Sequence, residues 1–199
     1  MKRLTIADLI DEKEVAQLFA EYGSAERWQV TLQVTAEFFE EWWERLVIKA
    51  NRRGEAVLAI QRPDGQILLH TKSFYPEGIF RLPSGGIHPH EAVLIGTTRE
   101  TQEETGLKVS TNRFLGMVEY NFQSNQRELP FVSYIWLVQT DNGQPSVQDP
   151  NERISGFRYV HPTELRNVAA QLRALPEAWR DWGHFRAPPH DMVAVALRG

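Results

Sequence analysis

The segment at residues 85–107, GGIHPHEAVLIGTTRETQEETGL, constrains the fold more than any other part of this 199-residue chain. On a helix, positions i, i+3 and i+4 share one face, so we expect the carboxylates of Glu100, Glu103 and Glu104 to converge. Like charges at this spacing destabilise a helix, and we expect Arg99 to relieve the repulsion only in part. A divalent cation resolves the conflict, because carboxylate oxygens are the ligands that Mg²⁺, Mn²⁺ and Ca²⁺ prefer.

The residues between these glutamates favour the same conclusion. Gly96 and four threonines lower the helix propensity of the segment, so we expect tertiary packing to hold the helix in place. Gly106 fits the left-handed position that ends a helix, and Gly85-Gly86 is predicted to form a turn that a side chain would obstruct. For the three glutamates taken alone, a solvated acidic face is the alternative interpretation.

The spacing of the charged residues resembles the signature box of the Nudix hydrolase family. Seven fixed positions match, and chance agreement is on the order of 10⁻⁸ per register at background residue frequencies. Thr101 departs from the pattern, because the family usually has an aliphatic residue at this packing position. The flanking strands and the LPSGG sequence extend the resemblance to roughly residues 50–175. The matching positions are Gly85, Glu91, Arg99, Glu100, Glu103, Glu104 and Gly106.

The resemblance implies an enzyme that cleaves a diphosphate linked to another moiety, using a divalent metal and water. It implies Mg²⁺, with Mn²⁺ as a substitute, held by Glu100, Glu103 and Glu104 and by the Gly85 carbonyl. Glu103 is then a ligand or the base that activates water. Arg99 is expected to form an ion pair with Glu91 that braces the loop against the helix.

Candidates outside the box are weaker, and each has a structural alternative. In this family a carboxylate before a late strand often assists catalysis, and Glu152 occupies a matching place; its alternative is a loop charge. Arg81 and Arg127 are candidates for phosphate contacts, against the alternative of ordinary surface arginines. Tyr120 is a candidate for stacking on a base, with core packing as the favoured interpretation. Further candidates, with core packing or an ordinary exposed position as the alternative, are Phe74, Tyr75, Phe80, His88, His90 and Glu119.

The rest of the chain predicts an α/β fold with a mixed sheet, and the resemblance implies that this fold is a Nudix-type α/β/α sandwich. Residues 1–49 are predicted to form an extension of helix, strand and helix. Residues 50–175 form the hydrolase domain, in which Pro63-Asp64-Gly65 joins two strands as a hairpin. Residues 176–199 form a tail that is helical in pieces. The aromatic stripe around Trp42 and Trp43 indicates packing against the main domain, with a homodimer contact as the alternative.

The composition and net charge of the chain limit the kinds of partner that we expect. Hydrophobic content of 42% and charged content of 24% are values of globular proteins. The net charge of −4 gives no broad attraction to nucleic acid, so we expect a small-molecule substrate and no nucleic-acid partner. The chain has no cysteine and no segment long enough to span a membrane, so we expect a cytoplasmic protein without a membrane partner.

The expected function is therefore metal-dependent hydrolysis of a nucleoside diphosphate derivative, a nucleotide sugar or similar compound. The alternative is a non-catalytic Nudix module that binds a nucleotide metabolite; such modules commonly lose box carboxylates, and this chain has kept them. An isomerase of the isopentenyl diphosphate branch needs a cysteine and is set aside. Neither Pro130 nor Tyr120 falls where the family's substrate markers for ADP-ribose and dinucleoside polyphosphates sit, so the sequence leaves the substrate open.

Overall fold

The structure is a computed structural model that describes residues 4–23, 26–141 and 143–198, and the side chains at 111 and 112 are excluded. Residues 1–3 and 24–25 of the predicted extension and residue 199 of the predicted tail lie outside it. The strands are β1 (Glu26–Gln33), β2 (Gly54–Gln61), β3 (Ile67–Lys72), β4 (Ser84–Ile87), β5 (Val109–Ser124), β6 (Arg127–Thr140) and β7 (Ile154–Val160). The α-helices are α1 (Glu12–Tyr22), α2 (Ala36–Trp43), α3 (Val93–Thr105), α4 (Leu165–Arg173) and α5 (Arg180–Ala196). The short 3₁₀ turns are η1 (Ile6–Asp8), η3 (Pro150–Glu152), η4 (Pro162–Glu164) and η5 (Glu177–Trp179), and η2 (Glu44–Ile48) is a π turn.

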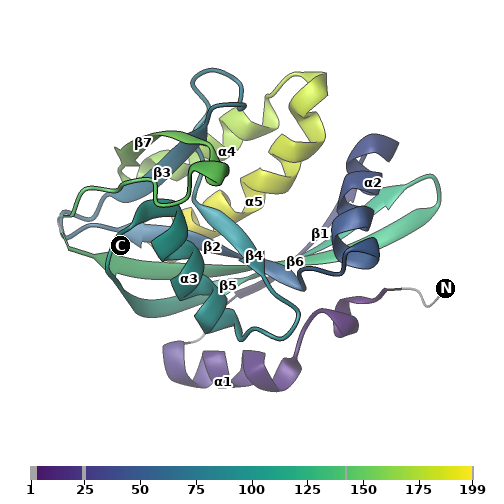
Figure 1. Cartoon of the computed structure of the whole chain (residues 1–199), viewed down its shortest axis with the longest axis horizontal. Helices are drawn as coiled ribbons and strands as arrows, with labels where there is room; N and C mark the ends of the chain where they lie inside the picture. Colours follow the sequence, from purple (N-terminus) through teal and green to yellow (C-terminus); the bar gives the residue numbers. More distant parts are fainter. Residues whose placement is uncertain (1–3, 24–25, 142, 199) are drawn as a thin grey trace.

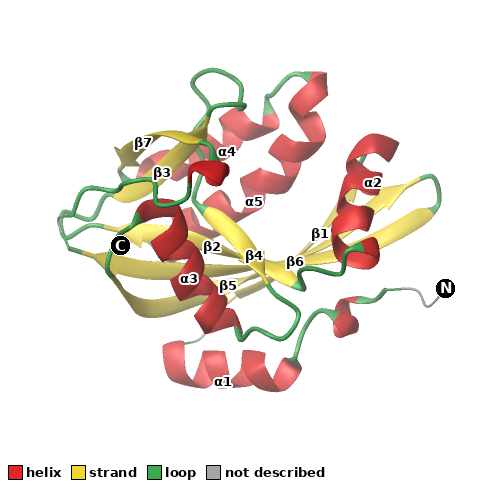
Figure 2. Cartoon of the chain, viewed as in Figure 1, coloured by secondary structure: helices red, strands yellow, loops and turns green. Residues whose placement is uncertain are grey.

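The described strands form one mixed seven-stranded sheet in the order β1-β5-β6-β2-β3-β7, with β4 paired to β2 (Figures 1 and 2). β1 runs parallel to β5 and β6 parallel to β2, whereas the other neighbours are antiparallel. The predicted hairpin between β2 and β3 is confirmed, with Gly65 at φ 85° in its turn. The predicted α/β class with a mixed sheet is likewise confirmed.

Helices cover both faces of the sheet because each central strand is apolar on both sides. In β2, Ala56, Leu58 and Ile60 belong to the core beneath α1 and α3. The alternate residues Val57 and Ala59 belong to the core beneath α2, α4 and α5. Alternation of this kind is what a strand buried between two helical layers requires.

The N-terminal extension is part of this architecture. β1 adds a strand to the free side of β5, pairing from Glu26↔Gly116 to Gln33↔Gln123. Thr35 caps α2, as predicted, by accepting a hydrogen bond from the Phe38 N–H at 3.3 Å. Trp42 is 4% exposed and lies 4.7 Å from the Phe131 ring, centroid to centroid, so this face of α2 packs within the chain.

The C-terminal tail differs from the prediction of helical pieces. After η5, α5 continues for 17 residues through Pro188 and Pro189. Both prolines are buried, as are Phe185 and Val193 on either side of them. Tertiary packing thus outweighs the helix-breaking tendency of proline at this point.

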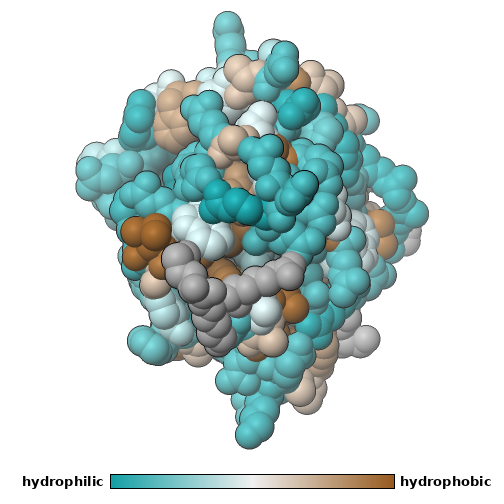
Figure 3. Space-filling model, turned by 90° about the vertical axis from the view of Figure 1, so that its right-hand side faces the viewer, coloured by the Kyte–Doolittle hydropathy of each residue, from teal (hydrophilic) through white to brown (hydrophobic). Residues whose placement is uncertain are grey.

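The outer surface is polar over most of the side that carries α2. Figure 3, turned to face this side, shows a mainly hydrophilic surface with hydrophobic residues in small separate patches. Across the part of the chain that is described, no helix is both long and apolar enough to cross a membrane.

Candidate active site

A cleft of about 870 Å³ separates α2 from the first turn of α5 and from the loop between β3 and β4. Its floor includes Ser84, Gly85 and Gly86 of β4, and Glu100 of α3 reaches its wall. Among the described residues that line it, carboxylates outnumber basic side chains. A cleft with this excess of negative charge favours cations.

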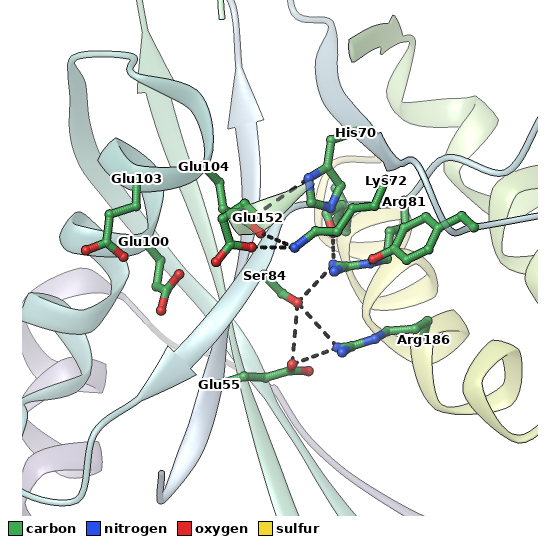
Figure 4. A network of polar contacts seen from close by, with 12 residues as sticks. Glu55, His70, Lys72, Arg81, Ser84, Glu100, Glu103, Glu104, Glu152 and Arg186 are labelled. Atoms are coloured by element: carbon green, nitrogen blue, oxygen red, sulfur yellow. Dashed lines mark hydrogen bonds and ion pairs between the residues drawn. The ribbon is translucent and has the colours of Figure 1, made fainter. Parts of the chain in front are cut away.

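Glu104 lies at the most buried end of the acidic group, next to Lys72 of β3 (Figure 4). Its side chain is 1% exposed, and the Lys72 Nζ lies 3.2 Å from its Oε1. Neither carboxylate oxygen has a hydrogen-bond partner in the described chain. Burial raises the pKa of Glu104 to about 7, although the charges of Arg81 and Lys72 oppose the shift. Lys72 also pairs with Glu152, so one ammonium links a box carboxylate to the predicted loop carboxylate.

His70 completes this buried corner. Its ring is 0% exposed, its Nδ1 lies 4.0 Å from Glu104 Oε2, and neither ring nitrogen has a described hydrogen-bond partner. Burial lowers the pKa of His70 well below its ordinary value, so the ring is neutral at neutral pH.

Glu100 lies against the backbone of β4. A Cβ placed on Gly85 would lie 1.7 Å from Glu100 Oε2, so a side chain at position 85 would displace this carboxylate. The predicted turn at Gly85-Gly86 is wrong: both residues belong to β4, and neither has a positive φ. The glycines are needed because other groups occupy the space of their side chains. Burial raises the pKa of Glu100, against the opposing effect of Arg99.

Arg99 binds more carboxylates than its position on the helix predicts. It donates to Glu91 Oε1 and Oε2 at 2.9 and 2.8 Å, to Glu100 Oε1 at 2.8 Å and to Glu103 Oε2 at 2.9 Å. It also donates to the Gly86 carbonyl at 2.8 Å, which ties α3 to β4. Hydrogen bonding to Arg99 is the main cause that lowers the pKa of Glu91. Arg99 therefore bridges Glu100 and Glu103 and relieves their repulsion in part, because its one positive charge is shared among three carboxylates.

The three box glutamates thus lie in three environments and do not converge as the spacing predicts. Glu103 is about half exposed, Glu100 lies against Gly85, and Glu104 points toward β3 (Figure 4). In the described part of the chain, no three His, Asp or Glu side chains are close enough together to hold a metal ion.

The chemistry of the site nevertheless fits a divalent cation. Glu104 Oε2 has no described hydrogen-bond donor, and Glu100 and Glu152 line the adjoining cleft. Lys72, whose Nζ lies 3.2 Å from Glu104 Oε1, and Arg99 supply positive charge to these carboxylates here. Carboxylate oxygens are the groups that a hard divalent cation binds.

A second, basic group lies on the other side of β4. Arg186 of α5 donates to Glu55 Oε2 at 2.7 Å, and Ser133 donates to Glu55 Oε1 at 2.7 Å. Arg81 is 4% exposed and donates to the Tyr75 hydroxyl at 2.8 Å and to Ser84 Oγ at 2.9 Å. The predicted phosphate contact Arg81 therefore reaches the cleft, but its donors already hold the cleft wall together.

Aromatic side chains form another wall of the cleft. Tyr75 packs against Trp182 with 4.8 Å between ring centroids, and Trp179 lies 5.4 Å from Trp182. Phe74, which is 44% exposed, lies 5.0 Å from Tyr75. All four rings line the cleft, where a flat base has room to stack.

Two predicted substrate contacts lie away from this cleft. Arg127 pairs with Glu40 on the surface and lies over the rings of Phe39 and Trp43. Tyr120 is 2% exposed and donates to the Phe185 carbonyl at 3.0 Å, which is a core contact. The structure brings neither side chain to the box glutamates.

Three weaker candidates are placed elsewhere. Glu119 pairs with Arg27 of the neighbouring strand. His88 and His90 are exposed, and His90 lines a separate shallow pocket beside α1.

Sequence reasoning missed Lys72, Glu55, Arg52 and Arg186, all of which line the cleft. A signal for Lys72 existed, because the apolar run Ile67-Leu68-Leu69 is followed in the same strand by the polar residues His70, Thr71 and Lys72. The sequence carried no such signal for Arg186, because its position beside β4 depends on how the C-terminal helix packs against the rest of the chain.

Comparison with known proteins identifies the family of the chain. The family model described as NUDIX domain matches residues 50–182, more than half of the chain and beyond the predicted boundary at 175. A MutT Nudix hydrolase from Burkholderia pseudomallei is 26% identical, over 70% of this chain and 95% of that chain, with a TM-score of 0.46. An Ap4A hydrolase from C. elegans is 19% identical, over 58% of this chain and 86% of that chain, with a TM-score of 0.42. At these TM-scores the two structures carry no argument of their own.

The assignment rests on the family model, whose match includes β2 through η5 and therefore every box carboxylate described above. Nudix enzymes hydrolyse pyrophosphate linkages and generally use divalent metal ions. The chain belongs to the Nudix family of pyrophosphohydrolases.

Proposed function

We propose that the protein hydrolyses the diphosphate linkage of a nucleoside diphosphate derivative, a nucleotide sugar or similar compound, with Mg²⁺ or Mn²⁺. The observation that carries this proposal is the buried Glu104 carboxylate, whose Oε2 has no described hydrogen-bond donor and whose Oε1 lies 3.2 Å from the Lys72 ammonium, beside a cleft large enough for a nucleotide. A cleft of 300 to 1,000 Å³ is the usual size of small-molecule sites. Residues 50–175 are the proposed catalytic domain. Residues 1–49 and 176–199 are proposed to complete its cleft.

Glu100, Glu104, Glu103 and the Gly85 carbonyl are the groups proposed to hold the metal. When bound, a divalent ion supplies positive charge for the phosphate oxygens and makes a bound water more acidic. Arg99 keeps Glu100 and Glu103 oriented through its hydrogen bonds. Lys72 holds Glu104 and Glu152 together and places a positive charge at the edge of the cleft.

The proposed roles leave Glu103 and Glu152 as candidates for the general base. Glu103 is about half exposed to solvent, and its described side-chain contact is the ion pair with Arg99. It can therefore reach an ordered water. Glu152 lies in the cleft wall opposite. A substrate base is proposed to stack beside Tyr75 and Trp179, which places its diphosphate toward β4.

The test is a hydrolysis panel with Mg²⁺ and with Mn²⁺, comprising ADP-ribose, NADH, nucleotide sugars, dinucleoside polyphosphates, nucleoside triphosphates, coenzyme A and capped RNA. On the best substrate, Glu104→Gln and Glu103→Gln should each lower kcat by about 10²- to 10⁴-fold, because each removes a charge needed for the reaction. Chelation of divalent ions should abolish turnover.

The control for this panel is Glu21→Gln, an exposed position on α1 outside the cleft, which should keep the parent rate. Parent-like turnover in both box variants would contradict the assignment of these glutamates. Tight binding of a panel compound without any turnover would favour the non-catalytic module instead.

A further inference from the structure

Arg52, immediately before β2, lines the cleft without a partner of its own. It makes no hydrogen bond or ion pair with any residue in the described ranges 4–23, 26–141 and 143–198, and its Nε is buried. The next residue, Arg53, is fully engaged, because it bonds Glu14 Oε2 at 2.6 Å and the Glu91 carbonyl at 2.8 Å. Buried donors are almost always paired, so an unpaired guanidinium in a cleft indicates a missing acceptor.

Two arginines and two glutamates act on Arg52. Burial, and then the charge of Arg45, lower the pKa of Arg52; the charges of Glu55 and Glu100 oppose this shift, and the charge of Arg186 adds to it. Arg45 has its own carboxylate in Glu41, and Arg186 has Glu55. The Nε of Arg186 is also buried without a described acceptor. Two buried guanidinium N–H groups, from opposite ends of the chain, therefore border one cleft without partners.

The position of Arg52 relative to β4 connects this basic group to the acidic one. A Cβ on Gly86 would lie 3.1 Å from Arg52 Cζ, just as a Cβ on Gly85 would meet the Glu100 carboxylate. Adjacent strand residues point to opposite faces, so Arg52 and Glu100 flank β4 from its two sides at successive residues. A diphosphate is a ligand with more than one anionic group, and it suits a cleft with a cation site on one side of a strand and a guanidinium on the other.

We propose that Arg52, together with Arg186, binds a phosphate group of the substrate that does not lie at the box carboxylates. This inference rests on the proposed function, from which the diphosphate substrate follows. It assigns Arg52 to substrate binding and specificity, because its planar fork matches two phosphate oxygens. Glu55 holds Arg186 in place for the same contact.

The test uses methylenediphosphonate, a diphosphate analogue that resists hydrolysis, titrated into the full-length protein with Mg²⁺ in a calorimeter. Arg52→Gln should raise its Kd by about ten- to a hundredfold, because a charge-assisted bidentate contact is lost. Arg52→Lys should restore part of the affinity, since it keeps the charge without the fork. With the best panel substrate, KM should rise more than kcat falls.

A structural role for Arg52 would show in stability instead. Because Arg52 makes no described bond, Arg52→Gln should leave the thermal midpoint unchanged or higher. Arg166→Gln, an exposed position on α4, is the matched control and should keep the parent Kd.

The inference is overturned if Arg52→Gln binds the analogue as tightly as the parent, or if the parent itself binds it more weakly than about 10 mM. Lower affinity together with a lower thermal midpoint, without recovery in Arg52→Lys, also overturns it. The proposed function fails separately: Arg52-dependent binding with no turnover of any panel compound would retain the phosphate site and reject the hydrolase.

Discussion

At the scale of single residues, Gly85 matters because the Glu100 carboxylate occupies the space that a side chain at position 85 would need. An alanine Cβ at this position would lie 1.7 Å from Glu100 Oε2. The backbone here is extended, so alanine itself fits the φ of the strand. The obstacle is the end of a flexible side chain, which can move away at little cost to the fold.

Gly85→Ala should therefore lower kcat by about ten- to a hundredfold while leaving the thermal midpoint close to the parent value, because a displacement of about 1 Å at a catalytic group is costly. Steady-state kinetics and thermal unfolding measure the two effects. Gly86→Ala is the matched control: its Cβ would approach Arg52 at 3.1 Å, so its effect should appear in KM rather than kcat. An unchanged kcat in Gly85→Ala would show that the position of Glu100 does not matter.

The identity of the box residues could be predicted from their spacing, but their surroundings could not. The box pattern singles out Glu104, yet a loop, β4 and most of α3 separate it from Lys72, and nothing local predicts their contact. Likewise Arg81 looks like a free phosphate ligand, although Tyr75 and Ser84 occupy its donors. Pairings between distant elements depend on tertiary structure and leave no trace in residue type.

At the scale of elements, α3 is held by packing rather than by propensity. Thr97, Thr101 and Thr105 lie four residues apart on its buried face, and each hydroxyl donates to the carbonyl four residues earlier. These hydroxyls are therefore satisfied without water, and the small side chains let the helix lie close to the sheet. Thr101 fills the packing position at which the family usually has an aliphatic residue, as predicted, with 0% exposure.

The start of α3 is capped by a residue from the N-terminal extension. Its N-cap position, Ala92, offers no side-chain acceptor, and Glu14 of α1 accepts from the Val93 N–H at 2.6 Å instead. Glu14 also pairs with Arg53 at 2.6 Å. An acidic side chain at a helix N-terminus satisfies a backbone donor and complements the helix dipole.

Glu14→Ala should lower the free energy of unfolding by about 1 to 2 kcal/mol, the usual cost of losing a helix cap. Urea unfolding measures this change, and Glu21→Ala on the exposed side of α1 should stay within about 0.5 kcal/mol of the parent. Equal values for the two variants would show that α3 does not need this cap.

The sequence predicts the end of an element correctly where a capping or turn residue marks it, and incorrectly elsewhere. Thr35 and Gly106 mark real helix ends. The β5–β6 turn carries no glycine signal, yet Asn125 and Gln126 both have positive φ, and the two strands pair as far as Ser124 and Arg127. The continuous α5 was missed because its prolines indicate a break that packing overrides.

At the scale of the whole molecule, His190 couples the C-terminal helix to the loop that leads into β4. Its Nε2 accepts from the Leu82 N–H at 3.0 Å, and its Nδ1 lies 2.9 Å from the Arg186 carbonyl, so a neutral ring satisfies both contacts. Burial lowers the pKa of His190 to about 3, although the bond to the Arg186 carbonyl opposes the shift. A proton on Nε2 would remove the acceptor of Leu82.

The protein should therefore lose stability as pH falls from about 6.5 toward 3, because in this range the unfolded chain protonates this histidine and the folded chain does not. The contribution is at most about 1.4 kcal/mol per pH unit. In His190→Gln the fall in the free energy of unfolding between pH 7 and pH 4.5 should be smaller than in the parent. Urea unfolding at both pH values provides the measurement.

The control for this experiment is His184→Gln, an exposed position on the same helix, which should keep the parent's pH dependence. An identical pH dependence in His190→Gln and the parent would contradict the buried neutral ring.

The parallel pairing of β1 with β5 has a consequence for how the chain is made. Their paired residues are 90 positions apart, as the contact between Gln29 and Glu119 illustrates. During synthesis β1 leaves the ribosome first, but its partner emerges only after β2, β3, β4 and α3 have been translated. The nascent N-terminal strand therefore lacks its native partner for its backbone donors and acceptors until β5 has been made, and an unpaired strand of this kind is open to pairing with other chains.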